Sequence, residues 1–179
     1  MLCNLCTNFP HTQENKNTRK VGHMKKIIIL MAILISTGVM AKVTAMFHPY
    51  DSTFIEIASR IKNARGRIDM ALYNIDVKKS NPIIATITSQ EIQAKMATGE
   101  LEIRLLFEGY EGKEKNRAKM TTLESYGIDV KYLGSSRKMH HKFAIIDGEH
   151  LITGSANWSM SSRKNYNENI LFFDDEVEM

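Results

Sequence analysis

Two neighbouring stretches of the chain decide the fold. Residues 139–147 read MHHKFAIID, and residues 150–158 read HLITGSANW. Both are rich in β-branched and apolar residues, and only Gly148 and Glu149 separate the two apolar runs. A two-residue connection of this kind predicts an antiparallel hairpin of two strands.

The spacing of polar residues around this hairpin divides them into two groups. Side chains two positions apart on a strand share a face, so His140 and Lys142 point the same way. Ser155 and Asn157 also share a face if their stretch is extended. Asp147 lies five residues beyond Lys142 and faces the opposite side, which suits a role in holding the local structure.

The first group has the residue types of a phosphate site that needs no metal. Lys142 supplies a positive charge, while Ser155 and Asn157 supply neutral donors for phosphate oxygens. A histidine such as His140 can attack phosphorus or transfer protons near neutral pH. Glu168, bonded to one ring nitrogen of His140, would fix the tautomer and leave the other nitrogen free.

Strand-like and helix-like segments alternate through the rest of the chain. The patterns predict further strands at residues 44–48, 67–75, 101–107, 128–133 and 169–173, and helices carrying residues 54–61, 80–97 and 113–126. Alternation of this kind favours an α/β fold with parallel pairing of the early strands.

The N-terminal part of the chain resembles a secretory signal. Residues 24–41 hold two lysines followed by about 15 mostly apolar residues, fewer than the roughly 20 of a membrane span. The alternative is an uncleaved membrane anchor. Residues 1–23 form a polar extension that we expect to be unstructured, and the Cys3–Cys6 pair lacks the partners of a zinc site. Residues 42–179 form the predicted domain.

The charge of the predicted domain is balanced. The whole chain has 24 basic and 20 acidic residues, but all of the excess positive charge lies before Lys42. A strong global field that attracts nucleic acid is therefore absent. Local basic residues flank the motif instead, namely Arg137, Lys138, Arg163 and Lys164.

The pattern H-x-K-x4-D-x6-G-S-x-N, followed by Glu168-Asn169, resembles the signature of the phospholipase D superfamily. The resemblance implies an α/β fold with a mixed, mostly parallel central sheet and helices on both faces. It also implies that His140, Lys142, Asn157 and Glu168 are catalytic. Lys142, Ser155 and Asn157 would bind the phosphate, with Asp147 and Gly154 as structural residues of the motif.

The same resemblance implies how the site works. In this superfamily two such motifs meet across a two-fold axis, and one histidine becomes a phosphohistidine while the other transfers protons. Because this chain has one motif, a homodimer is implied, with no cofactor and no metal. Relatives usually continue into a further helix after the last strand, so the resemblance also indicates a truncation at the C-terminus.

Three functions remain open from the sequence. The first is a secreted or periplasmic endonuclease acting on DNA or RNA. The second is a phospholipase D acting on phosphatidyl lipids or cardiolipin, associated with a membrane through the N-terminal segment. The third is an inactive binding protein that retains the fold.

Overall fold

The computed structural model describes residues 41–108, 113–133 and 138–175 of the chain. The predicted polar extension and residues 24–40 of the predicted signal segment lie outside these residues, as does Arg137, whereas Ala41 is already part of a strand. In the described part, no helix combines the length and the apolarity needed to cross a bilayer.

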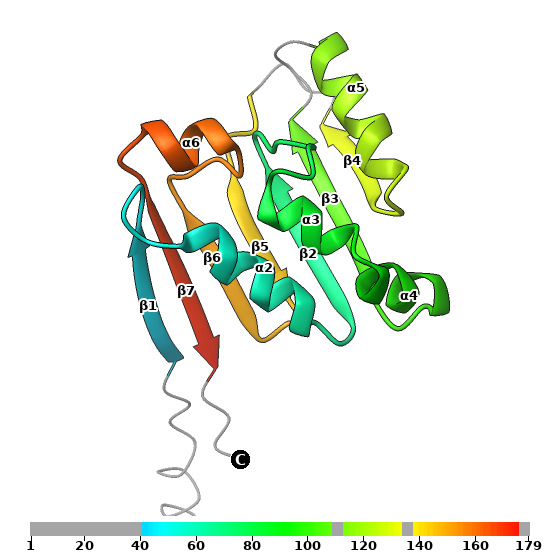
Figure 1. Ribbon diagram of the computed structural model, residues 1–179, viewed down its shortest axis with the longest axis horizontal. Coiled ribbons are helices and arrows are strands. Elements are labelled where there is room, and N and C mark those ends of the chain that lie inside the picture. Colours follow the sequence, from blue (N-terminus) through cyan, green and yellow to red (C-terminus); the bar gives the residue numbers. More distant parts are fainter. Residues whose placement is uncertain (1–40, 109–112, 134–137, 176–179) are drawn as a thin grey trace, which may run out of the picture. The chain divides into compact units, whose positions relative to one another are not determined.

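One seven-stranded sheet organises the described residues (Figure 1). Its spatial order is β1-β7-β6-β5-β2-β3-β4. The strands are β1 (Ala41–Phe47), β2 (Arg67–Leu72), β3 (Glu102–Glu108), β4 (Asp129–Leu133), β5 (Lys142–Ile146), β6 (His150–Gly154) and β7 (Asn169–Asp175). The helices are α2 (Thr53–Asn63), α3 (Pro82–Ile87), α4 (Gln90–Thr98), α5 (Lys113–Glu124) and α6 (Met160–Asn165).

The mixed α/β class is confirmed, but the expectation of a mostly parallel sheet is wrong. Strand β2 pairs with β3 and β3 with β4 in parallel, as expected for the early strands. The other four pairs are antiparallel. A tight hairpin can join only antiparallel strands, whereas a parallel pair needs a longer crossover. In the described ranges, two neighbouring pairs of strands are joined by such a crossover.

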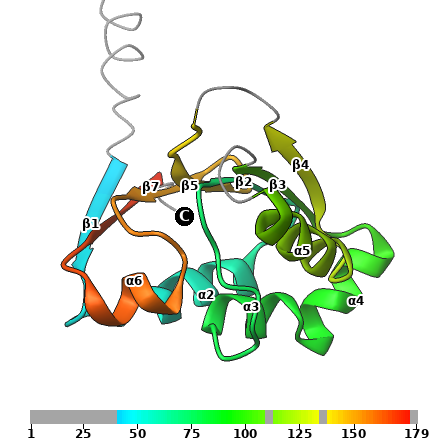
Figure 2. The ribbon, with the colours of Figure 1, turned by 90° about the horizontal axis from the view of Figure 1, so that it is seen from above.

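The expectation of helices on both faces is also wrong for the described residues. Figure 2 shows their helices on one side of the sheet. On the other side Leu106, Ile145 and Leu151 remain 36–37% exposed. The strand order explains the arrangement. Strands β2, β3 and β4 follow one another in a single direction, so right-handed crossovers place their helices on the same face.

The core lies between the sheet and its helices. Helix α2 contributes Phe54, Ile57 and Ile61, all fully buried. Helix α3 contributes Ile83, Ile84 and Ile87, which are also fully buried. Burial of side chains of this size stabilises the domain by roughly 1.5–3 kcal/mol each, which anchors the helices on this face of the sheet.

The helix predicted over residues 80–97 is divided into two in the structure. Asn81 begins α3 by accepting a hydrogen bond from the Ile83 backbone N–H at 3.1 Å. Ser89 begins α4 in the same way, from Ile92 at 3.4 Å. A serine hydroxyl competes with the backbone for helical hydrogen bonds, so a new N-terminus forms where the periodicity alone indicates continuity. Strand β2 is also shorter than expected. It ends at Leu72, whereas the pattern predicts a strand that continues to residue 75.

Asp147 closes the β5–β6 hairpin at the end of the strand opposite to His140. Its carboxylate accepts backbone hydrogen bonds from Arg65, Gly66 and Arg67 at 2.9–3.0 Å. Burial raises the pKa of this carboxyl, but the three N–H donors outweigh it and hold the pKa below its usual value. These contacts tie the start of β2 to the hairpin, which is a structural task.

Gly154 ends β6 where the backbone of β7 passes very close. A Cβ atom added at Gly154 would lie 2.1 Å from the Asn169 carbonyl oxygen and 2.9 Å from the Ile170 Cα atom. Neither backbone atom can move without breaking the pairing of Gly154 with Ile170. The glycine of the motif is therefore required by this close approach of two strands.

We expect Gly154→Ala to lower the free energy of unfolding by at least about 4 kcal/mol, the range reached only by severe steric or cavity defects. Urea unfolding followed by circular dichroism measures this loss. Gly66→Ala is the matched control, because its new Cβ would meet nothing closer than the Asp147 Oδ1 atom at 3.7 Å. Equal stability of the two variants would contradict the assigned role of Gly154.

Candidate active site

Four strand ends meet at the edge of the sheet that carries the motif. Strand β2 ends beside the start of β5, since Leu72 pairs with Lys142. Strand β6 ends beside the start of β7, since Gly154 pairs with Ile170. The motif residues that precede β5 and β7, or follow β6, are therefore gathered at this one edge, at the top of the sheet in Figure 1.

The expected proximity of His140 and Lys142 is confirmed. The Lys142 Nζ atom lies 3.2 Å from His140 Nδ1 and 3.3 Å from Nε2, and it donates to the His140 carbonyl oxygen at 2.9 Å. The two ring nitrogens are almost equally distant from the ammonium, so the ammonium does not point at the lone pair of either nitrogen. An imidazole and an ammonium thus face the same small region, where both could contact one phosphate group.

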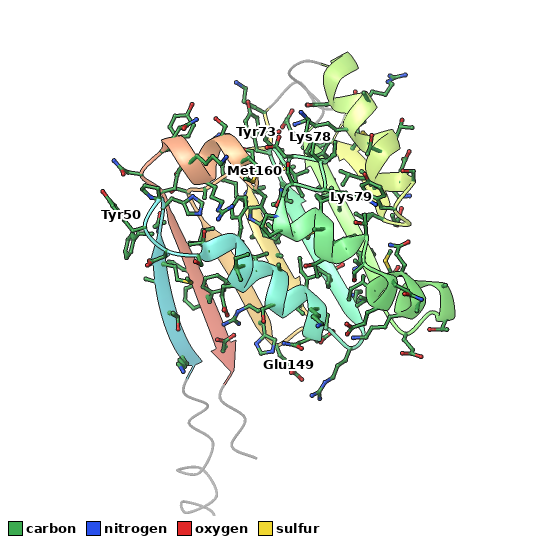
Figure 3. All side chains as sticks on the ribbon, viewed as in Figure 1. Tyr50, Tyr73, Lys78, Lys79, Glu149 and Met160 are labelled. Atoms are coloured by element: carbon green, nitrogen blue, oxygen red, sulfur yellow. The ribbon has the colours of Figure 1, made fainter. Side chains whose placement is uncertain are left out.

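Tyr73 completes this pair, although the sequence had indicated no role for it. Its ring lies 4.6 Å from the His140 ring, centroid to centroid, at an interplanar angle of 59°. The Lys142 Nζ atom lies 5.4 Å from the centre of the same ring. Figure 3 shows Tyr73 at the motif edge of the sheet. The aromatic ring therefore limits the rotation of the imidazole and favours the positive charge of the lysine.

Lys142 is nearly buried, with 7% of its surface exposed. Desolvation lowers the pKa of its ammonium, and the carboxylate of Glu168 partly opposes this shift. The charged form of Lys142 is therefore less stable here than in water. A bound phosphate would supply the missing countercharge and raise the pKa again.

Glu168 does not make the contact with His140 that the sequence led us to expect. Its Oε2 atom accepts a hydrogen bond from the Ser155 hydroxyl, and Oε1 accepts one from the Ser162 hydroxyl at 3.4 Å. No hydrogen bond joins Glu168 to His140 among the described residues. The backbone places β7 beside β6, so the nearest donors to this carboxylate come from Ser155 and from α6.

Ser155 is consequently committed to local bonds. Its hydroxyl donates to Glu168 and accepts from the Asn169 backbone N–H at 3.1 Å. A hydroxyl has one proton, so Ser155 could donate to a phosphate oxygen only by releasing Glu168. In the described geometry its clearest task is to hold the carboxylate at the start of β7.

Asn157 is partly buried, and its Oδ1 atom is buried without a hydrogen-bond partner among the described residues. Unsatisfied buried amide atoms cost free energy and are rare. The neighbouring Trp158 fixes the backbone here, because its N–H donates to the Asn74 carbonyl at 3.1 Å and its side chain is fully buried. An amide oxygen only accepts hydrogen bonds, so Asn157 could bind a phosphate oxygen only through its NH2 group.

Two buried residues beneath the site were also missed from the sequence. Glu108, at the end of β3, accepts a hydrogen bond from the Met139 backbone N–H. His48 is 2% exposed, contacts the Thr53 hydroxyl through Nε2, and its backbone N–H donates to the Glu168 carbonyl at 2.9 Å. Burial lowers the pKa of His48. Both residues fix the backbone next to motif residues, and only long-range contacts identify them.

No cluster of His, Cys, Asp and Glu residues suited to a metal ion is found in the ranges that the structure describes. The carboxylates near the motif are occupied by serine hydroxyls or backbone N–H groups. The metal-free mechanism remains a prediction from the motif.

Residues 57–179 match the family described as cardiolipin synthase, PLD-like domain. The chain belongs to this family. This PLD-like domain is also 25% identical over 126 residues to human mitochondrial cardiolipin hydrolase, covering 70% of this chain and 46% of that protein. The corresponding protein of Xenopus tropicalis is 47% identical over 55 residues, which cover 31% of this chain and 26% of that protein.

The PLD-like domain also resembles solved structures of bacterial proteins. NucT from Helicobacter pylori has a TM-score of 0.59 and 24% identity, covering 76% of this chain and 87% of that structure. Nuc from Salmonella typhimurium, a phospholipase D family member, has a TM-score of 0.56 and 20% identity, covering 76% and 84%. These structures support the fold. The chain spans less than half of the length of the two curated relatives named above.

Proposed function

We propose that this PLD-like domain is a metal-independent phosphodiesterase that cleaves nucleic acid through a phosphohistidine intermediate at His140. The observation that carries the proposal is the contact of the Lys142 ammonium with the His140 ring at 3.2–3.3 Å, backed by Tyr73. The ammonium can hold two phosphate oxygens while an imidazole nitrogen approaches phosphorus.

The proposed reaction has two steps and needs two histidines. In the first, a nitrogen of His140 forms a bond to phosphorus, the bond to the departing alkoxide breaks, and a second imidazole donates a proton to that oxygen. In the second, this imidazole takes a proton from water, the hydroxide attacks phosphorus, and the bond to His140 breaks. The chain carries one such motif, so we assign the second imidazole to His140 of the partner subunit in a homodimer.

Nucleic acid is the favoured substrate because basic side chains flank the motif along the chain. Lys138 and Lys164 are exposed and Arg163 is partly exposed. Several cations around one phosphodiester suit a polyanion whose neighbouring phosphates also need contacts. Secretion of the domain through residues 24–41 belongs to the same proposal.

A second candidate is hydrolysis of a phosphatidyl lipid such as cardiolipin. The observation that favours it is the similarity to the mitochondrial cardiolipin hydrolases. The chemistry at phosphorus would be the same, and only the groups attached to the phosphate would differ. Membrane association would then involve the N-terminal segment.

A substrate comparison tests the two candidates. Purified protein is incubated with a single-stranded DNA oligonucleotide and, separately, with vesicles that contain phosphatidylcholine and cardiolipin, each in EDTA. We expect cleavage of the oligonucleotide to persist in EDTA, with little hydrolysis of lipid. Loss of cleavage in EDTA would indicate a metal-dependent mechanism, and rapid hydrolysis of cardiolipin alone would favour the second candidate.

The shared site predicts a dominant effect of inactive subunits. After subunit exchange with a tenfold excess of His140→Ala protein, about one wild-type chain in eleven retains a wild-type partner, so activity per wild-type chain should fall about tenfold. The same excess of an unrelated inert protein is the control, and gel filtration reports the dimer. Unchanged activity in exchanged samples would show that one chain suffices.

A further inference from the structure

A cavity adjoins the candidate active site. It has a volume of about 670 Å³, and its lining includes Ser155 and Glu168 on the side of the motif. The opposite side is formed by the end of β1 and the turn that follows, with Phe47 and Tyr50. The cavity thus shares Ser155 and Glu168 with the motif edge, although His140 and Lys142 do not line it, and a substrate held at the motif could extend past these two residues into it.

Two aromatic rings of this cavity are unusually exposed. Tyr50 is 87% exposed and Phe47 is 53% exposed. Figure 3 shows Tyr50 projecting away from the sheet next to the end of β1. Among the other aromatic side chains of the described residues, only Tyr166 is comparably exposed, at 56%, whereas Phe54, Phe107 and Phe172 are buried in the core. Exposed aromatic rings beside a polar site are typical of surfaces on which a planar group stacks.

The charges of the cavity exclude a second phosphate as its occupant. No lysine or arginine is among the described residues that line the cavity, whereas the acidic residues Asp51 and Glu168 are part of the lining. Asn167 and Asn169 add carboxamide groups, which can donate and accept hydrogen bonds. The lining therefore favours an uncharged group that is planar and has hydrogen-bonding edges.

From these features we infer that the cavity binds the nucleobase next to the scissile phosphodiester, stacked on Tyr50 with Phe47 beside it. This inference rests on the proposed function, and it names the nucleobase as the second part of the substrate that the protein recognises. The phosphate lies with His140 and Lys142, while the base enters the cavity past Ser155 and Glu168. We expect the cavity to bind all bases without preference, because every base presents a π-face to an aromatic ring.

A lipid fits these features less well. An acyl chain would leave the carboxamides of Asn167 and Asn169 without partners, and burying unpaired polar groups costs free energy. The second phosphate of a cardiolipin would meet Asp51 and Glu168 without a cation in the lining. A nucleobase avoids both costs.

The test compares cleavage of an intact single-stranded oligonucleotide with that of the same oligonucleotide carrying an abasic site at a single scissile position. For Tyr50→Ala we expect kcat/KM on the intact oligonucleotide to fall about 10- to 100-fold, the range for loss of one base–aromatic stack. Cleavage at the abasic position should be the same for Tyr50→Ala and the wild type. Since Tyr50 is largely exposed, the thermal stability of the variant should not change.

Two further variants at the same position separate stacking from simple apolar contact. Tyr50→Phe keeps the ring and should retain cleavage, whereas Tyr50→Leu keeps only the apolar surface and should behave like Tyr50→Ala. Full activity of Tyr50→Leu, or equal losses on intact and abasic substrates, would overturn the inference while leaving the proposed function intact. Failure of the wild-type protein to cleave any oligonucleotide would overturn both.

Discussion

Replacement of His140 by alanine is expected to lower phosphodiester cleavage by at least about 10⁴-fold, as removal of a covalent nucleophile does in other hydrolases. The loss should be this large because the same side chain serves both as nucleophile and, from the partner subunit, as proton donor. Hydrolysis of a labelled oligonucleotide under single-turnover conditions measures it. Acid-quenched samples of the wild-type protein should in addition contain a covalent protein–phosphate adduct that the variant lacks.

The chain offers a matched control at the next position. His141 is exposed, and its ring contacts Phe143 at a centroid distance of 5.9 Å, on the alternate side of the strand from Lys142. His141→Ala should therefore keep activity within a few-fold of the wild type. Comparable losses in the two variants would mean that neither histidine is specifically the nucleophile.

Replacement of Lys142 by methionine is expected to abolish most activity and, at the same time, to stabilise the free protein at neutral pH. Activity should fall by about 10²–10³-fold or more, because a donor to the developing charge on phosphate is lost. Stability should rise because the wild-type protein must hold a charged ammonium in a desolvated position, whereas methionine fills similar space without charge.

The stability difference should also depend on pH in a defined direction. The pKa of Lys142 is lower in the folded protein than in the unfolded chain. Between these two pKa values the unfolded chain binds more protons, so the wild-type protein gains stability as the pH rises. The advantage of Lys142→Met should therefore be largest near neutral pH and shrink toward alkaline pH.

Urea unfolding of both proteins at several pH values measures this trend. Lys131→Met is the control, because Lys131 is exposed and lies in β4 at the far edge of the sheet from β1. A Lys142→Met protein that is less stable than the wild type at neutral pH, or whose advantage grows with pH, would contradict the account of a strained charge.

Local sequence patterns predicted most of the secondary structure. Two apolar runs and their two-residue connection identified the β5–β6 hairpin, and the order of strand-like and helix-like segments located β2, β3, β4 and β7. The errors arose where local signals compete. Ser89 divides a helix that hydrophobic periodicity indicates as continuous. Strand β2 ends at Leu72 instead of residue 75, although the Tyr73 N–H still donates to the His141 carbonyl at 2.8 Å.

The sequence by itself determined that an imidazole and an ammonium would lie on one side of a strand, because a strand has a period of two residues. It also indicated that Asp147 faces the opposite side and has a structural role, but not that its carboxylate binds backbone N–H groups. Only the tertiary structure decided that Tyr73 backs the pair, that Glu168 is bound by serines, and that Phe47 and Tyr50 border the same edge. Those contacts join residues far apart in the chain, and their geometry follows from strand order and crossover handedness, which no local pattern encodes.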